Sequence, residues 1–137
     1  MKEVFNKALE ELNGGNEFVV ASVVKTSGST PQKPGSKLLV KTDGKTIGTL
    51  GGGCVEGDIW FASKEILEKG GKSKYQDYVL NEDLAANDGL VCGGTMYFLI
   101  DPYRKSNIEI NEKILSEIEK GYQGEFSLAS ATIVDSK

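Results

Sequence analysis

The stretch FVVASVV, residues 18–24, is apolar at almost every position and rich in valine. Such a run is typical of a strand in the interior of a sheet, because a strand with one face in water would alternate apolar and polar side chains. Helices must then cover both faces of that sheet. This stretch therefore predicts an α/β fold, a single domain in which a mixed β-sheet is covered by helices.

The segments on either side of this strand fit such a domain. Apolar residues recur at helical spacing in residues 2–13 and 54–69, and each run is followed by a pair of glycines, which predicts two amphipathic helices. KLLVK and TIGTL, joined through Asp43-Gly44, predict a β-hairpin. The remaining predicted elements are strands at 74–80 and 95–100, a loop at 81–89 and a helix from an N-cap at Asn111 to Lys120.

Composition and charge exclude several classes of protein. The chain has 137 residues, enough for one domain with a proper core, and 39% of them are hydrophobic. Its net charge of −4 argues against a protein that binds nucleic acid or membrane surfaces without specificity. Because the N-terminal segment is amphipathic and no stretch approaches the ~20 apolar residues of a membrane span, we expect a cytoplasmic protein.

The sequence has no histidine and two cysteines, Cys54 and Cys92. Without histidine, the usual serine or cysteine triads and the usual zinc sites are excluded. Each cysteine lies against glycines: Cys54 follows the triple glycine 51–53, and Cys92 precedes Gly93-Gly94. A lone cysteine is often a small buried hydrophobe. Two in glycine turns suggest soft metal ligands, persulfide carriers or a redox pair.

Two other stretches could bind an anion. In the constrained loop SGSTPQKPGSK, residues 27–37, hydroxyl and lysine donors surround two prolines, although a rigid turn with solvated lysines has the same composition. The glycine turn before helix 54–69 exposes main-chain N–H groups suited to a phosphate. Its spacing does not match a dinucleotide fingerprint or a P-loop, and Glu56 and Asp58 would oppose a dianion.

Three motifs in order, GSTPQKPG (28–35), GTLGGGCVEGD (48–58) and GLVCGGT (89–95), resemble the N-terminal domain of the XdhC/CoxI family. These proteins are maturation factors of molybdenum hydroxylases such as xanthine dehydrogenase and carbon monoxide dehydrogenase. The resemblance covers roughly residues 5–103. It implies a protein that binds the molybdenum cofactor (molybdopterin) transiently and assists its sulfuration and insertion into the hydroxylase. Such a protein is a cofactor chaperone more than a turnover enzyme.

The same resemblance implies a site and partners. The resemblance gives the positions, and from the residue types there we infer that Cys54 and Cys92 would be the metal ligands and that a pterin phosphate would lie on the glycine turn and the Lys33 loop. The implied partners are the apo hydroxylase, a cysteine desulfurase and a second copy of the chain. The implied cofactor-binding residues are Gly28, Ser29, Thr30, Lys33, Gly51, Gly52, Gly53, Cys54, Glu56, Cys92, Gly93 and Gly94.

Residues 1–103 are thus expected to form the XdhC/CoxI-like domain and residues 104–137 a further helix and strand. The pattern Glu17-Phe18-x-x-Ala21-Ser22 recurs at 125–130, either by convergence or as the start of a second repeat. Family proteins commonly continue into a C-terminal nucleotide-binding-like domain. Two other functions stay open: a thiol redox protein using Cys54 and Cys92, and an adaptor that only docks a hydroxylase.

Overall fold

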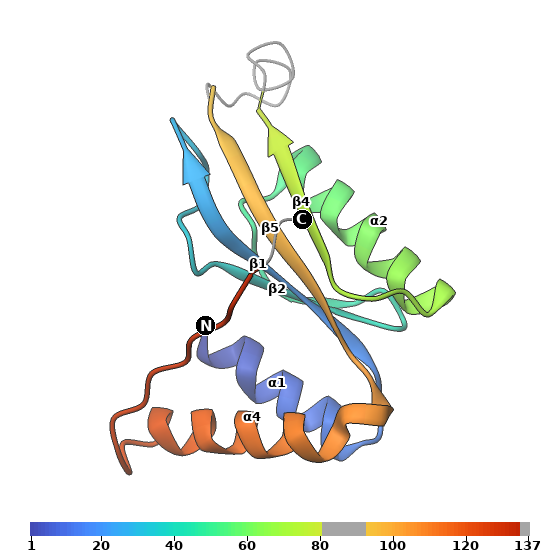
Figure 1. Ribbon diagram of the computed structural model, residues 1–137, viewed down its shortest axis with the longest axis vertical. Coiled ribbons are helices and arrows are strands. Elements are labelled where there is room, and N and C mark those ends of the chain that lie inside the picture. Colours follow the sequence, from blue (N-terminus) through green and yellow to red (C-terminus); the bar gives the residue numbers. More distant parts are fainter. Residues whose placement is uncertain (81–92, 135–137) are drawn as a thin grey trace.

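The computed structural model of the protein describes residues 1–80 and 93–134. Its centre is a five-stranded sheet in the order β3-β2-β1-β5-β4 (Figure 1). The strands are β1 (Phe18–Ser27), β2 (Lys37–Lys41), β3 (Thr46–Gly48), β4 (Lys74–Val79) and β5 (Thr95–Tyr103). The helices are α1 (Lys2–Asn13), α2 (Gly53–Lys69) and α4 (Ile108–Tyr122), with a short 3-10 turn, η1 (Lys105–Asn107), before α4.

The α/β class and the helix-covered sheet are confirmed, but the four strand pairings are all antiparallel where a mixed sheet was predicted. β3 and β4, joined by the α2 crossover, do run in the same direction, as such a crossover favours. They lie at opposite edges of the sheet, however. Because β5 is inserted between β1 and β4, no two parallel strands are neighbours.

The valine-rich strand is buried on both faces, as its composition predicts. Val19, Ala21 and Val23 pack under α2, whereas Phe18 and Val20 pack under α1 and α4. In Figure 1, α2 follows one face of the sheet, and α1 and α4 lie together across the lower half of the other face. None of the described helices lies over the upper half of that second face. None of the helices in the described residues is long and apolar enough to cross a membrane.

Several elements extend further than the sequence predicts. β1 continues to Ser27 because a register irregularity between Val23 and Lys25 keeps it paired with β5 after its pairing with β2 ends. β5 continues through Pro102 to Tyr103. Beyond Ile100, β5 has no β4 neighbour, so a proline there costs little on that edge. The last helix begins at Ile108 rather than after Asn111, with Asn107 as its N-cap. The predicted loop 81–89 lies outside the described residues.

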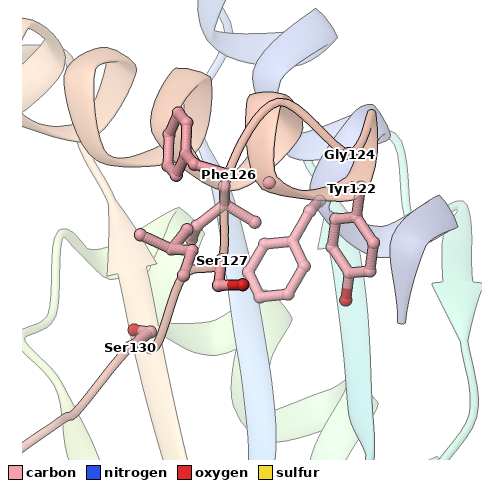
Figure 2. Close-up of a pocket in the computed structure, with 9 residues that line it drawn as sticks. Tyr122, Gly124, Phe126, Ser127 and Ser130 are labelled. Carbon is pink, nitrogen blue, oxygen red and sulfur yellow. The ribbon is translucent and has the colours of Figure 1, made fainter.

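The strand predicted near Phe126 does not form, since residues 125–134 lie outside any helix or strand. This segment instead turns back over α4, where the side chain of Leu128 lies close to Gly121. Together with α1 and α4 it encloses an open pocket of about 650 Å³, which Phe126 and Tyr122 help to line (Figure 2). Residues 125–134 pair with none of the described strands, and an isolated strand has no partner for its main-chain hydrogen bonds. Whether residues 104–137 begin a second repeat stays a prediction.

Arg104 follows β5 and ties the end of α2 to the sheet. Its Nη2 donates hydrogen bonds to the carbonyl oxygens of Ile66 at 2.7 Å and Gly71 at 2.9 Å. Its Nη1 lies 3.5 Å from the carboxylate of Glu17, which immediately precedes β1. One guanidinium thus joins three segments, and its planar fork of donors suits this better than a lysine ammonium would.

We expect Arg104→Ala to lower the free energy of unfolding by about 2 kcal/mol, because hydrogen bonds from a charged donor are lost at a half-buried position. Arg104→Lys should recover part of this loss. Urea denaturation measures both, with Lys105→Ala at the exposed neighbouring position as the control. An Arg104→Ala protein as stable as the control would contradict this role.

Candidate functional site

The loop from 28 to 36, which joins β1 to β2, is held in shape by its own hydrogen bonds. The N–H of Val23 donates to the carbonyl of Ser36 at 2.9 Å, and the N–H of Gly35 donates to the carbonyl of Val23 at 2.8 Å. Within the loop, the side chain of Gln32 accepts a hydrogen bond from the Ser36 hydroxyl at 2.9 Å. Ser29 and Lys33 stay exposed on this frame and are therefore accessible to a ligand.

The loop, the glycine turn and the start of β5 converge, although they are far apart in sequence. A Cβ atom placed on Gly51 would lie 2.8 Å from the Cβ of Pro31. A Cβ atom placed on Gly94 would lie 2.4 Å from the carbonyl oxygen of Ser29. Gly28 also lies against Gly94. These contacts require residues without side chains, so they explain part of the glycine content of all three motifs.

The triple glycine makes the turn from β3 into α2. Gly51, Gly52 and Gly53 have φ angles of 107°, 74° and 64°, a region that other L-residues rarely adopt. Gly52 is the N-cap of α2, and Cys54 is the second residue of the helix, where its side chain is exposed. A helix N-terminus favours the thiolate form of a cysteine. The turn therefore presents one accessible sulfur next to bare main chain.

Glu56 lies in the first turn of α2, and its carboxylate holds the preceding glycine turn in shape. Its Oε2 accepts hydrogen bonds from the N–H of Leu50 at 2.8 Å, the N–H of Gly52 at 2.9 Å and the hydroxyl of Thr49 at 2.9 Å. The hydroxyl of Thr49 in turn accepts the N–H of Gly51 at 3.1 Å. The two N–H groups that would cradle a phosphate here thus bind a carboxylate of the chain itself. Glu56, predicted to bind cofactor, contacts the protein's own turn in this structure.

The pKa of Glu56 reflects these contacts. Partial burial acts to raise it, but the hydrogen bonds from Leu50, Gly52 and Thr49 outweigh burial and lower the pKa below its ordinary value. The side chain is therefore a carboxylate at neutral pH. Its negative charge also complements the dipole at the start of α2.

The sequence analysis missed a pocket of about 280 Å³ beside the turn. Its lining residues are Leu38, Gly44, Thr46, Gly52, Gly53, Glu56, Gly57 and Trp60. The indole Nε1 of Trp60 donates to the carbonyl of Gly44 at 2.9 Å, which joins α2 to the β2–β3 turn. The spacing Gly53, Gly57, Trp60 places these residues on one face of the helix and could have revealed this surface.

The second half of the predicted thiol pair cannot be placed, since Cys92 lies outside the described residues. Its neighbour Gly93 has open space around its Cα, with no described atom within 4 Å of an added Cβ. Within the part of the chain that the structure describes, no three Asp, Glu or Cys side chains gather as a metal site. The described site thus offers a single exposed thiol, loop donors and a glycine-walled surface, which suits holding a ligand.

Comparisons with known proteins bear on the fold and on the family resemblance. The model of the XdhC and CoxI family matches residues 12–78, a range that includes the first two motifs but not Cys92. A solved structure described as a xanthine dehydrogenase from Bacillus halodurans superposes with a TM-score of 0.69 at 26% identity, over 85% of this chain and 35% of that one. The fold and the family resemblance are thereby confirmed.

Three curated proteins match as well. A Bacillus subtilis protein named as a probable subunit of xanthine dehydrogenase is 43% identical over 36% of this chain and 15% of its own length. The uncharacterized protein YqeB of Escherichia coli is 33% identical over 71% of this chain and 18% of its own length. The molybdenum cofactor insertion chaperone PaoD of Escherichia coli is 29% identical over 50% of this chain and 22% of its own length. The chain thus spans less than a quarter of the length of these relatives.

Proposed function

We propose that this chain, whose residues 12–78 match the model of the XdhC and CoxI family, takes part in the maturation of a molybdenum hydroxylase. In this proposal it binds the molybdenum cofactor as cargo and assists its sulfuration and insertion into an enzyme of the xanthine dehydrogenase or carbon monoxide dehydrogenase type. Its partners are the apo hydroxylase, a cysteine desulfurase and a second copy of the chain, in the cytoplasm. The similarity to a cofactor insertion chaperone supports this role.

One observation carries the proposal: the loop 28–36, the glycine turn and Gly94 meet at one end of the sheet, with the exposed Cys54 beside them. Sulfur is the donor in this set that suits a soft metal centre, and thiolate is its binding form. We assign the thiolate of Cys54 to the molybdenum or to transferable sulfur. We assign the exposed side chains of Ser29 and Lys33 to contacts with the polar groups of the cofactor.

Among the described residues, the thiol of Cys54 could contact the cofactor, but the main-chain N–H groups of the glycine turn could not. Glu56 already accepts the hydrogen bonds of Leu50 and Gly52. Its carboxylate would also repel a phosphate placed there. We therefore assign Glu56 and the glycines 51–53 to shaping the turn, and the contacts with the cofactor to Cys54 and the 28–33 loop. Cys92, Gly93 and Gly94 stay in the proposal as the third segment of the site.

Retention of the isolated cofactor tests the proposal. Anaerobically purified protein is mixed with molybdenum cofactor and gel-filtered, and molybdenum and pterin are measured in the protein peak. We expect stoichiometric co-elution with the wild type and a drop of at least ~10-fold in Cys54→Ser and Cys92→Ser, the scale of effect known for disturbed metal sites. Phe61→Ser is the matched control, because Phe61 is exposed on α2 but lines no part of the turn.

Two outcomes would count against this function in different ways. Full retention in both cysteine variants would remove the thiols from the site. A folded wild type that retains neither molybdenum nor pterin would overturn cofactor binding and favour an adaptor that only docks a hydroxylase. Pull-down of the apo hydroxylase with both cysteine variants then tests the adaptor directly.

Intact-mass measurement separates the proposal from a thiol redox function. A redox couple of Cys54 and Cys92 would lose two protons reversibly when the protein is oxidised and regain them under reducing conditions. Independent ligands would show no such change. A reversible mass loss of this kind in the wild type that disappears in either serine variant would favour the redox function.

A further inference from the structure

A pocket of about 560 Å³ lies on the face of the sheet that carries α1 and α4, in the part that these helices leave uncovered. The strands contribute Ser22, Lys25, Lys37, Tyr75 and Leu99, and the tail contributes Ser130, Thr132 and Val134. The remaining lining residues are Val23, Val24 and Gly35. None of the predicted cofactor-binding residues lines this pocket. It is therefore a separate feature from the site proposed above.

Lys37 is the central polar group of this pocket. Its side chain is half-buried, and its Nζ donates a hydrogen bond to the Oγ of Ser22 at 2.8 Å. Ser22 is itself only 9% exposed. Among the described residues, Lys7, Lys41, Lys64, Lys69 and Lys120 each have a carboxylate within ion-pairing distance, but Lys37 does not. A half-buried ammonium whose partner is a neutral hydroxyl can still form a charge-assisted hydrogen bond with an anion.

The charges around the pocket favour an anion on balance. Lys25 lies at its rim, with its Nζ 5.3 Å from the ring centroid of Tyr97. Among the described residues that line the pocket none is acidic, although the chain as a whole has a net charge of −4. Asp101, which lines an adjoining pocket together with Lys37, opposes an anion: burial lowers the pKa of Lys37, and the charge of Asp101 only partly offsets this. The Asp101 carboxylate is also engaged by the hydroxyl of Ser73.

We propose that this pocket binds an oxyanion of the phosphate class. The Nζ of Lys37 and the hydroxyl of Ser22 donate hydrogen bonds to it, and Lys25 adds a second positive charge at the rim. Charge-assisted hydrogen bonds of this kind are about twice as strong as neutral ones. Tyr75 and Leu99 form an apolar wall beside the anion, which fits the organic part of a phosphate ester better than free phosphate.

Competitive acetylation of the whole chain tests this proposal without any variant. Trace acetic anhydride labels the lysines, and mass spectrometry gives the rate at each position, with phosphate or phenyl phosphate added at constant ionic strength made up with chloride. At a ligand concentration about ten times the Kd, labelling of Lys37 should slow about tenfold. The exposed Lys72, which lines neither this pocket nor the proposed cofactor site, is the internal control and should not change.

The two probes distinguish the sources of the anion. Protection at lower concentrations of phenyl phosphate than of phosphate would identify a phosphate ester, with its ring against Tyr75 and Leu99. Equal protection would identify free phosphate. An unchanged labelling rate at Lys37, or equal slowing at Lys72 and Lys37, would overturn the proposal, because the second result indicates only charge screening.

Calorimetric titration with the same probes gives a second test. Lys37→Met preserves the length of the side chain without its charge, and it should abolish the binding that wild type and Lys72→Met retain. Circular dichroism checks that each variant is folded. Unchanged binding in a folded Lys37→Met protein would overturn the assignment of Lys37. Neither experiment contains molybdenum, so its result is independent of the proposed function.

Discussion

Gly94→Ala is expected to lower the free energy of unfolding by about 3 kcal/mol, the upper range for overpacking a well-packed position. The added Cβ would lie 2.4 Å from the carbonyl oxygen of Ser29 and 2.5 Å from that of Ser27. Both are main-chain atoms, so the clash cannot be relieved by a side-chain rotation. The end of β1 and the start of β5 must separate instead, which also breaks up the proposed cofactor site.

Urea denaturation measures the effect, and Gly93→Ala is the matched control. The two glycines are neighbours, but an added Cβ at Gly93 has no described atom within 4 Å. The control should therefore change the free energy of unfolding little. Equal stability of the two variants would show that Gly94 does not pack against the 27–30 segment. In the gel-filtration assay, a folded Gly94→Ala protein should retain less molybdenum than Gly93→Ala.

Glu56→Ala should cost about 2 kcal/mol of unfolding free energy, since three hydrogen bonds to one carboxylate oxygen are lost at a partly exposed position. The N–H groups of Leu50 and Gly52 would be left without this acceptor. Glu65→Ala is the control, because Glu65 is an exposed glutamate on the same helix and pairs only at the surface with Lys69. Urea denaturation at neutral pH should therefore separate the two variants.

The pH dependence of this effect follows from the lowered pKa of Glu56. Since its folded-state pKa lies below the ordinary value of 4.5, the carboxylate stabilises the fold fully above that value. The stabilisation is lost as the pH falls through the folded-state pKa. The difference in unfolding free energy between wild type and Glu56→Gln should therefore be constant near neutral pH and shrink below pH ~4.5. A constant difference down to pH ~3 would contradict the contacts of Glu56 with Leu50, Gly52 and Thr49.

The exposed thiol and the proposed anion pocket lie on different parts of the molecule and use different residues. The proposed cofactor site uses Cys54 and the 28–33 loop, next to a turn whose anion cradle is taken by Glu56. The proposed oxyanion pocket uses Lys37, the residue that begins β2 directly after that loop. One prolyl loop therefore leads into both features, and its rigidity benefits both, because a preformed loop loses less entropy on binding.

The sequence by itself determined the elements of this fold wherever the signal is local. The helix predicted at 2–13 is observed at Lys2–Asn13, and the one predicted at 54–69 is observed at Gly53–Lys69. The valine-rich stretch predicted an interior strand, and β1 is the central strand of the sheet. Periodicity and turn residues report which side chains must leave water within one segment, so these features can be predicted without knowledge of the partners.

Only the tertiary structure decided how these segments meet. The insertion of β5 between β1 and β4 kept these two parallel strands apart, and it brought Gly94 against Ser29. The same packing placed Lys37 over Ser22 and the Trp60 indole against Gly44. The carboxylate of Glu56, which the motif suggested as a ligand contact, instead accepts the N–H groups of its own turn. Such contacts depend on the free energy of the whole packed arrangement, to which distant segments contribute jointly. Local sequence patterns therefore cannot predict them.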